Sequence, residues 1–493
     1  MTRLYSTSVV IVVGLTGALF LTGESAVAQQ PPDSVVSDFN ENTAMGTGAL
    51  LDLTAGRYNT AAGHGALGSN SIGAFNTAVG DDALSSNTGG GSNSAFGTDA
   101  LRTNTTGSSN TASGTGALYG NTVGENNTAT GFAAMYTNTT GSYNLADGDH
   151  ALYDNTTGSY NTASGTAGLF RNQTGSFNTA SGFDALFSNT FGNSNTATGY
   201  QSLYSTTTSN DNTAVGYQAL YANSTGAANT ASGIAALHDN TTGIYNSASG
   251  GFALYANATG NFNTASGYQA LQANTNGLSN TAAGRGALFS NTSGSSNIAL
   301  GANAGYNLTT GSNNIDIGNE GAAGESATIR IGAASTQSST YLAGVSNSHL
   351  TGSAVYVSST GQLGVLASSE RYKTSIITLT GHDEKLQHLR PVSFHLKSEP
   401  AGPVQYGLIA EEVAAVYPEL VVRDDNGQIQ GVRYEELAPI LLSELQEQRK
   451  AIKAQNERIS AQDKQLDQLM KEYRSLQGAI QQLSDEGARV AAR

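Results

Sequence analysis

The sequence predicts a mostly β protein, in which a rod of stacked β-coils, a β-roll or β-solenoid, is followed by a small α+β domain and a C-terminal coiled-coil helix. Three observations lead to this fold class. A 17-residue motif repeats without interruption from residue 42 to residue 330. The charge pattern changes near residue 368. A heptad pattern of apolar residues runs through residues 441–484.

The N-terminus has the pattern of an export signal. Arg3 is its only positive charge, residues 9–20 form a short apolar run, and an A-x-A cleavage site ends at Ala28. We therefore expect residues 1–28 to be a signal peptide and residues 29–41 to be a linker. An uncleaved anchor is the alternative, although the apolar run is short for a membrane span.

Seventeen copies of one motif begin at asparagines spaced 17 residues apart, from Asn42 to Asn314. The consensus is N-T-A-x-G-x-x-A-L-x-x-N-T-T-G-x-x, numbered here as positions 1 to 17. Position 1 is Asn and position 5 is Gly in every copy. Position 3 is Ala except in the last copy, which has Asp316, and position 9 is Leu in fourteen copies and Met135 in another. A period this strict indicates that every repeat packs on its neighbours in the same way.

Short strands suit this motif better than helices, because two Gly and several Thr and Asn in each repeat oppose a helix. Seventeen extended residues allow a coil perimeter of at most about 56 Å, which fits a narrow solenoid with two short strands per coil. Coils stacked about 4.8 Å apart would form a rod roughly 80 Å long.

Strand alternation predicts which positions of the repeat face inward. Positions 3 and 5, Ala and Gly, would share one face, where only small side chains fit between close backbone walls. Positions 8 and 9, Ala and Leu, are neighbours and would point to opposite faces, so that one row would form a continuous apolar stripe outside the coil. Soluble proteins rarely leave such a stripe exposed. We therefore expect it to be buried between chains of an oligomer.

Two further kinds of row run along the predicted stack. Asn at positions 1 and 12 would form side-chain amide ladders. Position 10 is often aromatic, which favours a stacking seam that stabilises the coil, with a glycan-binding ladder as the alternative. The aromatic residues of this row are Tyr119, Tyr136, Tyr153, Phe170, Phe187, Tyr204, Tyr221, Tyr255, Phe289 and Tyr306.

The repeats resemble the head repeats of trimeric autotransporter adhesins. Motifs such as NTAVGYQAL (212–220) and NTASGYQAL (263–271) carry the resemblance, which covers about residues 42–330. It implies a trimeric, left-handed β-roll at a bacterial surface. Repeats in that family are usually a few residues shorter, so the resemblance extends to the architecture and not to its details.

Charge separates the repeats from the C-terminal segment. Residues 29–367 contain five Arg, no Lys and seventeen Asp or Glu, whereas residues 368–493 contain sixteen Lys or Arg and nineteen Asp or Glu. The net charge of −15 argues against a nucleic-acid partner, because no basic footprint is present. The absence of cysteine excludes a disulfide framework and a cysteine-based metal site. Residues 331–367 break the period and are expected to form a neck, with two short strands within residues 354–366.

The heptad pattern predicts a coiled coil over residues 441–484, followed by a tail at residues 485–493. Three consecutive Gln at position d cost stability but fix the register. A single amphipathic helix packed on its own domain is the alternative. Together with the rod, the pattern favours a homotrimer. Positions a are Leu445, Ile452, Ile459, Leu466, Tyr473 and Ile480, and positions d are Leu441, Gln448, Gln455, Gln462, Leu469, Leu476 and Leu483.

Four motifs occur in a fixed order between the rod and the heptads. They are SSERYK (368–373), RPVSFHLK (390–397), YGLIAEEVAAVYPEL (406–420) and VRYEELAPILLSEL (432–445). Together they resemble the intramolecular chaperone domain of phage tail spikes and endosialidases, peptidase family S74. The resemblance covers about residues 368–480, and we assign the domain to residues 368–440. It implies a domain that trimerises, helps the upstream β-structure to fold, and then cuts itself off.

The same resemblance implies the residues of a cleavage site. Ser368 matches the nucleophile of the family, Lys373 its general base and Arg371 the arginine between them, and the scissile bond is Ala367–Ser368. Ser369 stands where the family usually has Asp. A serine hydroxyl needs a base to remove its proton, and lysine can act as one only when it is neutral. The alternative is that Lys373 is a surface charge and Ser368 a helix cap.

These expectations combine into an exported, fibrous, adhesin-like protein at the cell surface or outside the cell, assembled as a trimer and cut at Ser368. A non-cleaving structural fibre, a phage-tail-fibre-like protein and a glycan- or ice-binding solenoid are the alternatives. We expect no cofactor, metal, nucleic acid or small-molecule substrate, while a host surface or glycan remains a possible ligand. Asp81-Asp82 and Asp424-Asp425 are interpreted as turn residues rather than calcium ligands.

Overall fold

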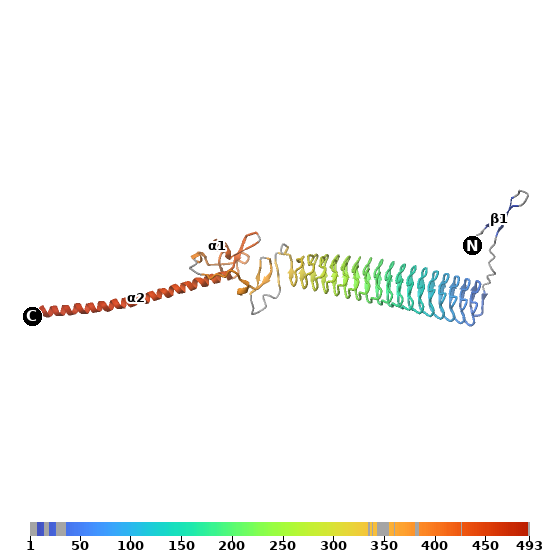
Figure 1. Cartoon of the computed structure of the whole chain (residues 1–493), viewed down its shortest axis with the longest axis horizontal. Helices are drawn as coiled ribbons and strands as arrows, with labels where there is room; N and C mark the ends of the chain where they lie inside the picture. Colours follow the sequence, from blue (N-terminus) through green and yellow to red (C-terminus); the bar gives the residue numbers. More distant parts are fainter. Residues whose placement is uncertain are drawn as a thin grey trace. The chain divides into compact units, whose positions relative to one another are not determined.

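The computed structural model divides the chain into two compact units, residues 1–341 and residues 342–493 (Figure 1). The residues that it describes are 7–13, 19–25, 36–333, 336–337, 339–342, 354–358, 360–379, 384–424 and 426–491. Strands β1 (Thr7–Val13) and β2 (Leu19–Ser25) pair antiparallel within the predicted signal peptide. The predicted cleavage site that ends at Ala28 lies outside the described residues.

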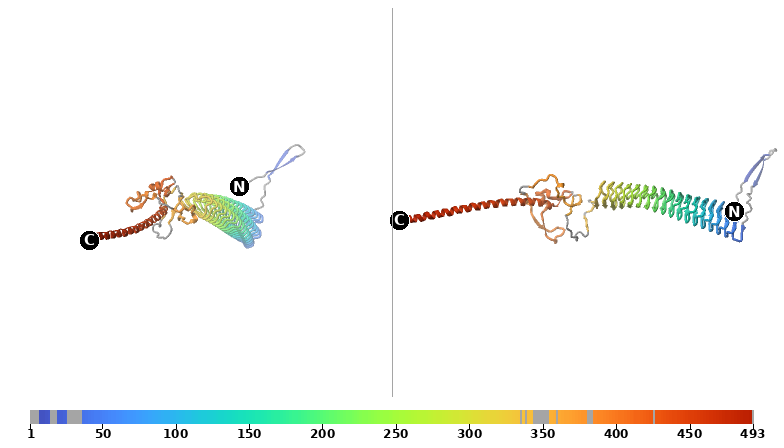
Figure 2. Two further views of the ribbon diagram at one scale, coloured as in Figure 1. Left: turned by 60° about the vertical axis from the view of Figure 1, so that its left-hand side comes forward. Right: turned by 60° about the horizontal axis from the view of Figure 1, so that its bottom comes forward.

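The rod is a parallel β-solenoid in which each repeat forms one coil. Positions 2 to 4 of every repeat form a three-residue strand that pairs in parallel, without a shift, with the strand of the next coil; Ala163, for example, lies opposite Ala180. Figure 2 shows the stacked coils from two sides. The predicted fold class is therefore confirmed. The expectation of two strands per coil is wrong for the described coils, where turns replace the second strand.

The ladder of the rod begins at β3 (Val36–Ser37), which pairs antiparallel with β4, and ends at β21. Its parallel strands are β4 (Thr43–Met45), β5 (Thr60–Ala62), β6 (Thr77–Val79), β7 (Ser94–Phe96), β8 (Thr111–Ser113), β9 (Thr128–Thr130), β10 (Leu145–Asp147), β11 (Thr162–Ser164), β12 (Thr179–Ser181), β13 (Thr196–Thr198), β14 (Thr213–Val215), β15 (Thr230–Ser232), β16 (Ser247–Ser249), β17 (Thr264–Ser266), β18 (Thr281–Ala283), β19 (Ile298–Leu300), β20 (Ile315–Ile317) and β21 (Ile329–Ile331).

The core of the rod differs from the predicted one at positions 8 and 9. Both rows are buried in a single chain: Ala185 and Leu186, for example, are fully inaccessible. Leu186 has a φ of 55°, in the left-handed region, and the other leucines of this row share this conformation. Side chains alternate only along an extended chain, and the left-handed φ of the leucine turns its side chain to the same side as that of the preceding alanine. The predicted apolar stripe outside the coil is therefore wrong, and these two rows give no argument for an oligomer.

The Ala and Gly rows have the close packing that the sequence predicts. Ala at position 3 is buried along the rod. Gly199, at position 5, has a φ of 130°, and a Cβ atom there would lie 2.4 Å from the carbonyl oxygen of Gly216 in the next coil. Only glycine combines this φ with so close a contact, which explains the glycine at position 5 in the coils from Gly46 to Gly284.

The predicted amide ladders are confirmed at both Asn positions. At position 1, the Oδ1 of Asn161 accepts the backbone N–H of Asn178 at 3.0 Å, and its Nδ2 donates to the carbonyl of Gly175 at 2.8 Å. At position 12, the Nδ2 of Asn189 donates to the Oδ1 of Asn172 at 2.7 Å. Because these side chains are fully buried, the ladders satisfy backbone groups that the turns leave unpaired.

The aromatic row at position 10 is a stacking seam, as predicted. From Tyr119 to Tyr255 each ring stacks on the next, with centroids 4.7–5.3 Å apart and planes within 11° of parallel. His238 continues the stack where the aromatic residue is missing. The faces of the inner rings are therefore occupied by neighbouring rings.

The last coil of the rod contains a charged group in the core. Asp316 of β20 occupies the alanine row, is fully buried, and has no hydrogen-bond partner for either carboxylate oxygen. Arg330 lies opposite it in β21 but is bound to Glu325, with 2.7 Å between Nη2 and Oε2. Burial, followed by the negative charge of Glu325, raises the pKa of Asp316 to about 6.

The second unit consists of small antiparallel sheets and helices. In the neck, β22 (Tyr356–Val357) pairs with β23 (Leu363–Gly364), which confirms the two predicted strands. The following elements are the 3-10 helices η2 (Glu370–Tyr372) and η3 (Glu384–His388), strands β24 (Val392–Phe394) and β25 (Gln405–Gly407), helix α1 (Ala410–Val416), η4 (Pro418–Leu420), strands β26 (Val421–Arg423) and β27 (Ile429–Val432), and the 58-residue helix α2 (Tyr434–Ala491). Among the described residues, no helix has both the length and the apolar content needed to cross a bilayer.

Candidate functional site

The segment around Ser368 folds into a tight turn that brings two predicted site residues together. The backbone N–H of Tyr372 donates to the carbonyl of Ser369, and that of Lys373 donates to the carbonyl of Glu370, both at 3.0 Å. These bonds form η2 and reverse the chain. As a result, the Nζ of Lys373 lies 3.4 Å from the Oγ of Ser368 and donates a hydrogen bond to it.

This Ser–Lys pair has the geometry of a nucleophile and a base, but it is solvated in the single chain. Ser368 and Lys373 are both exposed. A lysine gives up its proton readily only when its ammonium loses hydration, as it does in an apolar environment. In the single chain the described residues leave the pair open to water.

The peptide bond Ala367–Ser368 precedes η2 in an exposed stretch without regular secondary structure. Exposure leaves the carbonyl carbon of Ala367 accessible to a nucleophile. The flanking residues Val365 and Leu366 are 64% and 51% exposed, although both are apolar. Apolar side chains around the bond could supply the dry environment once another surface covers them.

The side chains of two neighbouring residues make no hydrogen bond to the pair among the described residues. Arg371 lies over the ring of Tyr372, with its guanidinium carbon 4.7 Å from the ring centroid. Ser369 precedes η2 and makes no side-chain capping bond. The structure therefore brings Ser368 and Lys373 together and points Arg371 to an aromatic ring.

The motifs downstream of the pair form one folded core. Val413, Tyr417, Leu420, Val421 and Leu437 are buried together, and they come from α1, η4, β26 and α2. The ring of Tyr417 also lies 5.3 Å from the ammonium nitrogen of Lys385. The motifs that the sequence presents as separate stretches therefore belong to one small domain.

Two polar contacts in this domain were not assigned from the sequence. Arg390 binds Glu412 of α1, with 2.6 Å between Nη2 and Oε1, and this hydrogen bond lowers the pKa of Glu412. The hydroxyl of Tyr434, the first residue of α2, accepts the backbone N–H of Leu408 at 2.8 Å. Each residue lies inside a quoted motif, but one sequence does not reveal which polar residues of two motifs pair.

Helix α2 carries the heptad pattern on an uncovered face. Leu445, Ile459 and Leu483 are 48%, 47% and 68% exposed, and the remaining apolar heptad residues lie between 50% and 68%. A 58-residue helix with such a seam has nothing to bury it within the described residues of one chain. The alternative of an amphipathic helix packed along its length on its own domain therefore does not agree with the structure.

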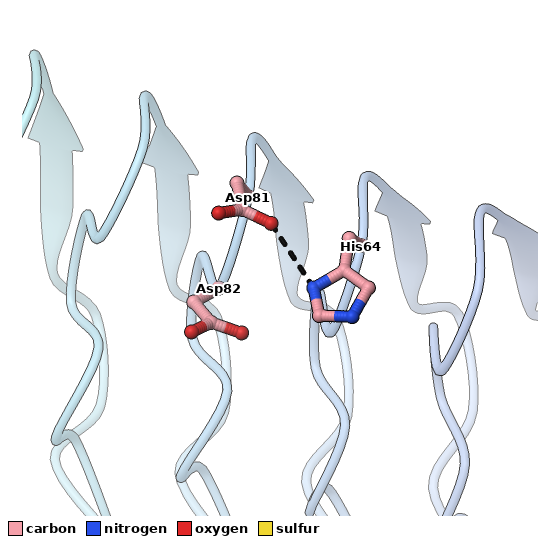
Figure 3. A group of neighbouring side chains, drawn as sticks. All are labelled: His64, Asp81 and Asp82. Atoms are coloured by element: carbon pink, nitrogen blue, oxygen red, sulfur yellow. Dashed lines mark hydrogen bonds and ion pairs between the residues drawn. The ribbon is translucent and has the colours of Figure 1, made fainter.

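A cluster of possible metal ligands lies on the first coils of the rod (Figure 3). His64, Asp81 and Asp82 come from adjacent coils, and one ligand atom of each lies within 4.8 Å of those of the others. The Nδ1 of His64 is 3.1 Å from the Oδ1 of Asp81, and Asp82 is bound to Arg102 at 3.2 Å. These contacts already use the carboxylates, so we assign no ion to the cluster.

The interpretation of the acidic pairs as turn residues agrees with the structure at the three of these residues that it describes. Asp81 and Asp82 lie in a turn of their coil. The Oδ1 of Asp424 accepts the backbone N–H groups of Asn426 and Gln428 at 3.0 and 2.8 Å, in the loop between β26 and β27. Asp425 lies outside the described residues.

A comparison with protein families identifies the domain that carries the Ser–Lys pair. Residues 368–422 match the model of Peptidase_S74, described as chaperone of endosialidase. The match begins at Ser368 and includes Lys373, β24, β25, α1 and η4. A search of curated proteins and a search of solved structures found no significant match to the chain.

Proposed function

We propose that this protein is an exported, trimeric, adhesin-like fibre, whose S74-type domain joins three chains, aligns the rods during folding, and then cuts the bond Ala367–Ser368. The observation that carries the proposal is the uncovered heptad seam of α2, which follows an endosialidase-type chaperone domain in the same chain. The rod is the part of the chain whose folding the domain would assist.

Assembly is supported by the pattern of the seam. The seam extends over six heptads and consists mainly of Leu and β-branched Ile, with Gln at three consecutive d positions, and all of these residues are exposed in one chain. Burying such a seam between helices is the main source of stability in a coiled coil. A parallel arrangement places the three S74 domains side by side at the same height, and therefore the three rods as well.

The repeats explain why the three rods would need to be aligned during folding. Because Ala, Leu and Asn recur every 17 residues, a chain that folds one coil out of register buries nearly the same groups. Folding can start anywhere in such a repeat array and spread to the neighbouring coils. A domain that joins the chains at one end gives all three rods the same starting point.

Cleavage is supported by the 3.4 Å contact between Ser368 and Lys373. In the proposed reaction, neutral Lys373 takes the proton of the Ser368 hydroxyl while its oxygen bonds to the carbonyl carbon of Ala367. The carbon–nitrogen bond breaks, the nitrogen accepts a proton, and the acyl group moves to the serine oxygen as an ester. Water then hydrolyses this ester, leaving a carboxylate on Ala367 and a free amine on Ser368.

Cleavage would depend on assembly, because Ser368 and Lys373 are exposed in one chain. In one chain Lys373 is exposed, and a lysine acts as a base readily only where its ammonium loses hydration. Partner chains packed against Val365 and Leu366 would exclude water from the site. The cut would then occur only in chains that have assembled, which makes it a proofreading step.

Three alternatives keep part of this proposal. In the first, the domain assembles the fibre and never cuts. In the second, the protein is a tail fibre of a phage, which the family match also permits. In the third, the rod binds a glycan or ice through its Thr and aromatic rows, which a glycan array and a thermal-hysteresis assay would detect.

The test of the proposal is the intact mass of the purified full chain beside Ser368→Ala and Lys373→Ala. We expect fragments divided between residues 367 and 368 in the parent and an uncut chain in both variants. Ser369→Ala and Lys397→Ala are the matched controls, since they remove a neighbouring hydroxyl and an exposed ammonium, and both should be cut like the parent.

Two results would contradict parts of the proposal. An intact, trimeric parent would remove the cleavage step and leave a folding and assembly module. A parent that has the mass of one chain in solution would remove the trimer.

A further inference from the structure

The outward face of the rod changes its chemistry near its C-terminal end. Positions 2 and 4 of each coil point outward, and from β8 to β18 most of these residues are Thr or Ser. In β19 to β21 all six are aliphatic. We call these six residues the aliphatic face: Ile298, Leu300, Ile315, Ile317, Ile329 and Ile331.

The aliphatic face is exposed and continuous. Ile329 and Ile331 are 65% and 70% exposed, Leu300 is 53% exposed, and Ile315 is half-buried. The strand register places Ile298, Ile315 and Ile329 in one row and Leu300, Ile317 and Ile331 in a second row beside it. Two aliphatic rows over three adjacent strands form a patch of the kind that binds another surface.

Charged groups of these strands are kept away from the patch. Asp316, between the two rows in β20, points into the core and is fully buried. Arg330, at the same place in β21, is half-buried and bound to Glu325. The outward positions of the three strands therefore carry no charge, although the chain as a whole has a net charge of −15.

We propose that the aliphatic face is the contact between rods of different copies of this chain, and that this contact starts at β19. The inference rests on the proposed assembly through α2. A parallel coiled coil relates its chains by rotation about one axis, so equivalent residues of each copy lie at the same height. An uncharged apolar patch is suited to meet its own copy, since copies of a chain with this net charge repel one another elsewhere.

Described segments farther along the chain also leave apolar residues exposed. In the neck, Val357 of β22 and Leu363 of β23 are 67% and 65% exposed. The seam of α2 follows farther along the chain. The described segments from β19 onward thus leave apolar residues uncovered in one chain, whereas the outward face of β8 to β18 is mostly Thr and Ser and suits contact with water.

The test uses the absence of cysteine from the chain, which makes a single introduced thiol specific. Ile317→Cys places one on the aliphatic face, at position 4 of its coil. Ser249→Cys is the matched control at position 4 of β16, on the Thr- and Ser-rich part of the same face. Both full-length proteins are treated with a short bismaleimide, and the same samples are weighed in solution by light scattering.

We expect cross-linked chains on a denaturing gel for Ile317→Cys and few or none for Ser249→Cys, with both proteins trimeric in solution. Ile331→Cys, at the more exposed edge of the patch, provides a second variant in case Ile317→Cys does not fold. Circular dichroism of each variant verifies that the rod is intact.

Each of the other outcomes would contradict one part of the proposal: the contact between rods, its start at β19, or the assembly itself. A trimer without cross-links at residue 317 and at residue 331 removes the contact between rods and leaves the proposed assembly in place; a segment of the same chain then covers the patch. Equal cross-linking at residue 249 shows that the contact does not start at β19. A single chain in solution removes both this contact and the proposed assembly.

Discussion

The leucines at position 9 determine how one chain fills its own rod. Each has a left-handed φ, a conformation that costs about 1 kcal/mol or more for a residue with a Cβ atom. In return, both the Leu and the preceding Ala point into the coil and are removed from water. Burying a leucine side chain contributes roughly 2 kcal/mol, so the strain is offset within each coil.

Asp316 places an ionisable side chain in this otherwise apolar row of the core. Because burial raises its pKa to about 6 from the ordinary 3.8, the folded chain binds a proton more tightly there than the unfolded chain. The tighter binding of this proton adds to the free energy of unfolding. The added stability is fully present below about pH 4 and is lost as the pH rises through 6. At neutral pH the last coil contains a buried charge without a partner.

We predict that Asp316→Ala, which restores the residue of the other coils, stabilises the end of the rod at pH 7.5 by about 2 to 3 kcal/mol, and that the gain disappears at pH 4. Hydrogen exchange of the backbone amides of β20, corrected for intrinsic rates, measures this local stability. Asp211→Ala removes an exposed carboxylate and is the control, with no change expected at either pH. An equal gain at both pH values would show that the charge of Asp316 is not the cause.

Among the elements, α2 has the largest uncovered apolar surface. Its heptad residues are exposed over the length of the helix, and nothing else in the described residues buries them. Three Gln at consecutive d positions weaken the centre of the seam, so the apolar residues at position a in this region carry more of the contact.

We predict that Ile452→Ser combined with Ile459→Ser shifts the full chain from a trimer to single chains of about 50.4 kDa, because two buried a positions in the weak part of the seam are lost. The mass in solution, from light scattering or sedimentation, is the measurement. Ala454→Ser with Ala461→Ser, on the outer side of the same turns, should leave the assembly unchanged. A trimer in the first double variant would show that other surfaces hold the chains together.

The elements also show what one sequence can predict. The 17-residue period, the Ala and Gly rows, the amide ladders and the aromatic seam follow from side-chain chemistry that recurs visibly along the chain, and all are confirmed. The direction of Leu at position 9 does not follow from its chemistry. Leucine has no preference for a left-handed φ, and only the closure of the coil imposes it on residues such as Leu186.

The candidate site was indicated by the resemblance of four motifs to a known family, and the contact between its two residues is local. The spacing of Ser368 and Lys373 is local, and η2 brings them to 3.4 Å within one turn of the chain. The contacts of Arg390 with Glu412 and of Tyr434 with Leu408 join residues 22 and 26 positions apart. Such pairs depend on how the domain folds back on itself, which no spacing in a single sequence specifies.

At the scale of the whole molecule, the rod is a modular array. Each coil contacts its two neighbours through the same backbone bonds, amides and rings. Its stability is then close to a sum over coils and their contacts, so the number of coils can change without a change in the pattern.

We predict that deletion of residues 161–177, one complete repeat, leaves a folded rod whose melting temperature by circular dichroism lies within a few degrees of the parent value. Tyr153 then stacks on Phe187, and Asn144 bonds to Asn178, as equivalent residues do elsewhere. Deletion of residues 161–170 is the matched comparison, since it displaces every later position of the repeat. Equal melting of the two deletion variants would contradict a core that depends on register.

The direction of the bonds between coils has a mechanical consequence. In the strands and turns, backbone N–H groups bond to carbonyl groups about one repeat farther along or one repeat back, and so the bonds run along the stack from coil to coil. Tension applied to the two ends of a rod therefore acts along these bonds, and the outermost coil peels first because it is bonded to a neighbour on one side only. Each coil that is released lengthens the chain by roughly 50 Å, since 17 extended residues span about 56 Å and a stacked coil about 4.8 Å. A fibre built in this way yields in small equal steps and keeps the rest of its length folded, which suits a tether under intermittent pulling.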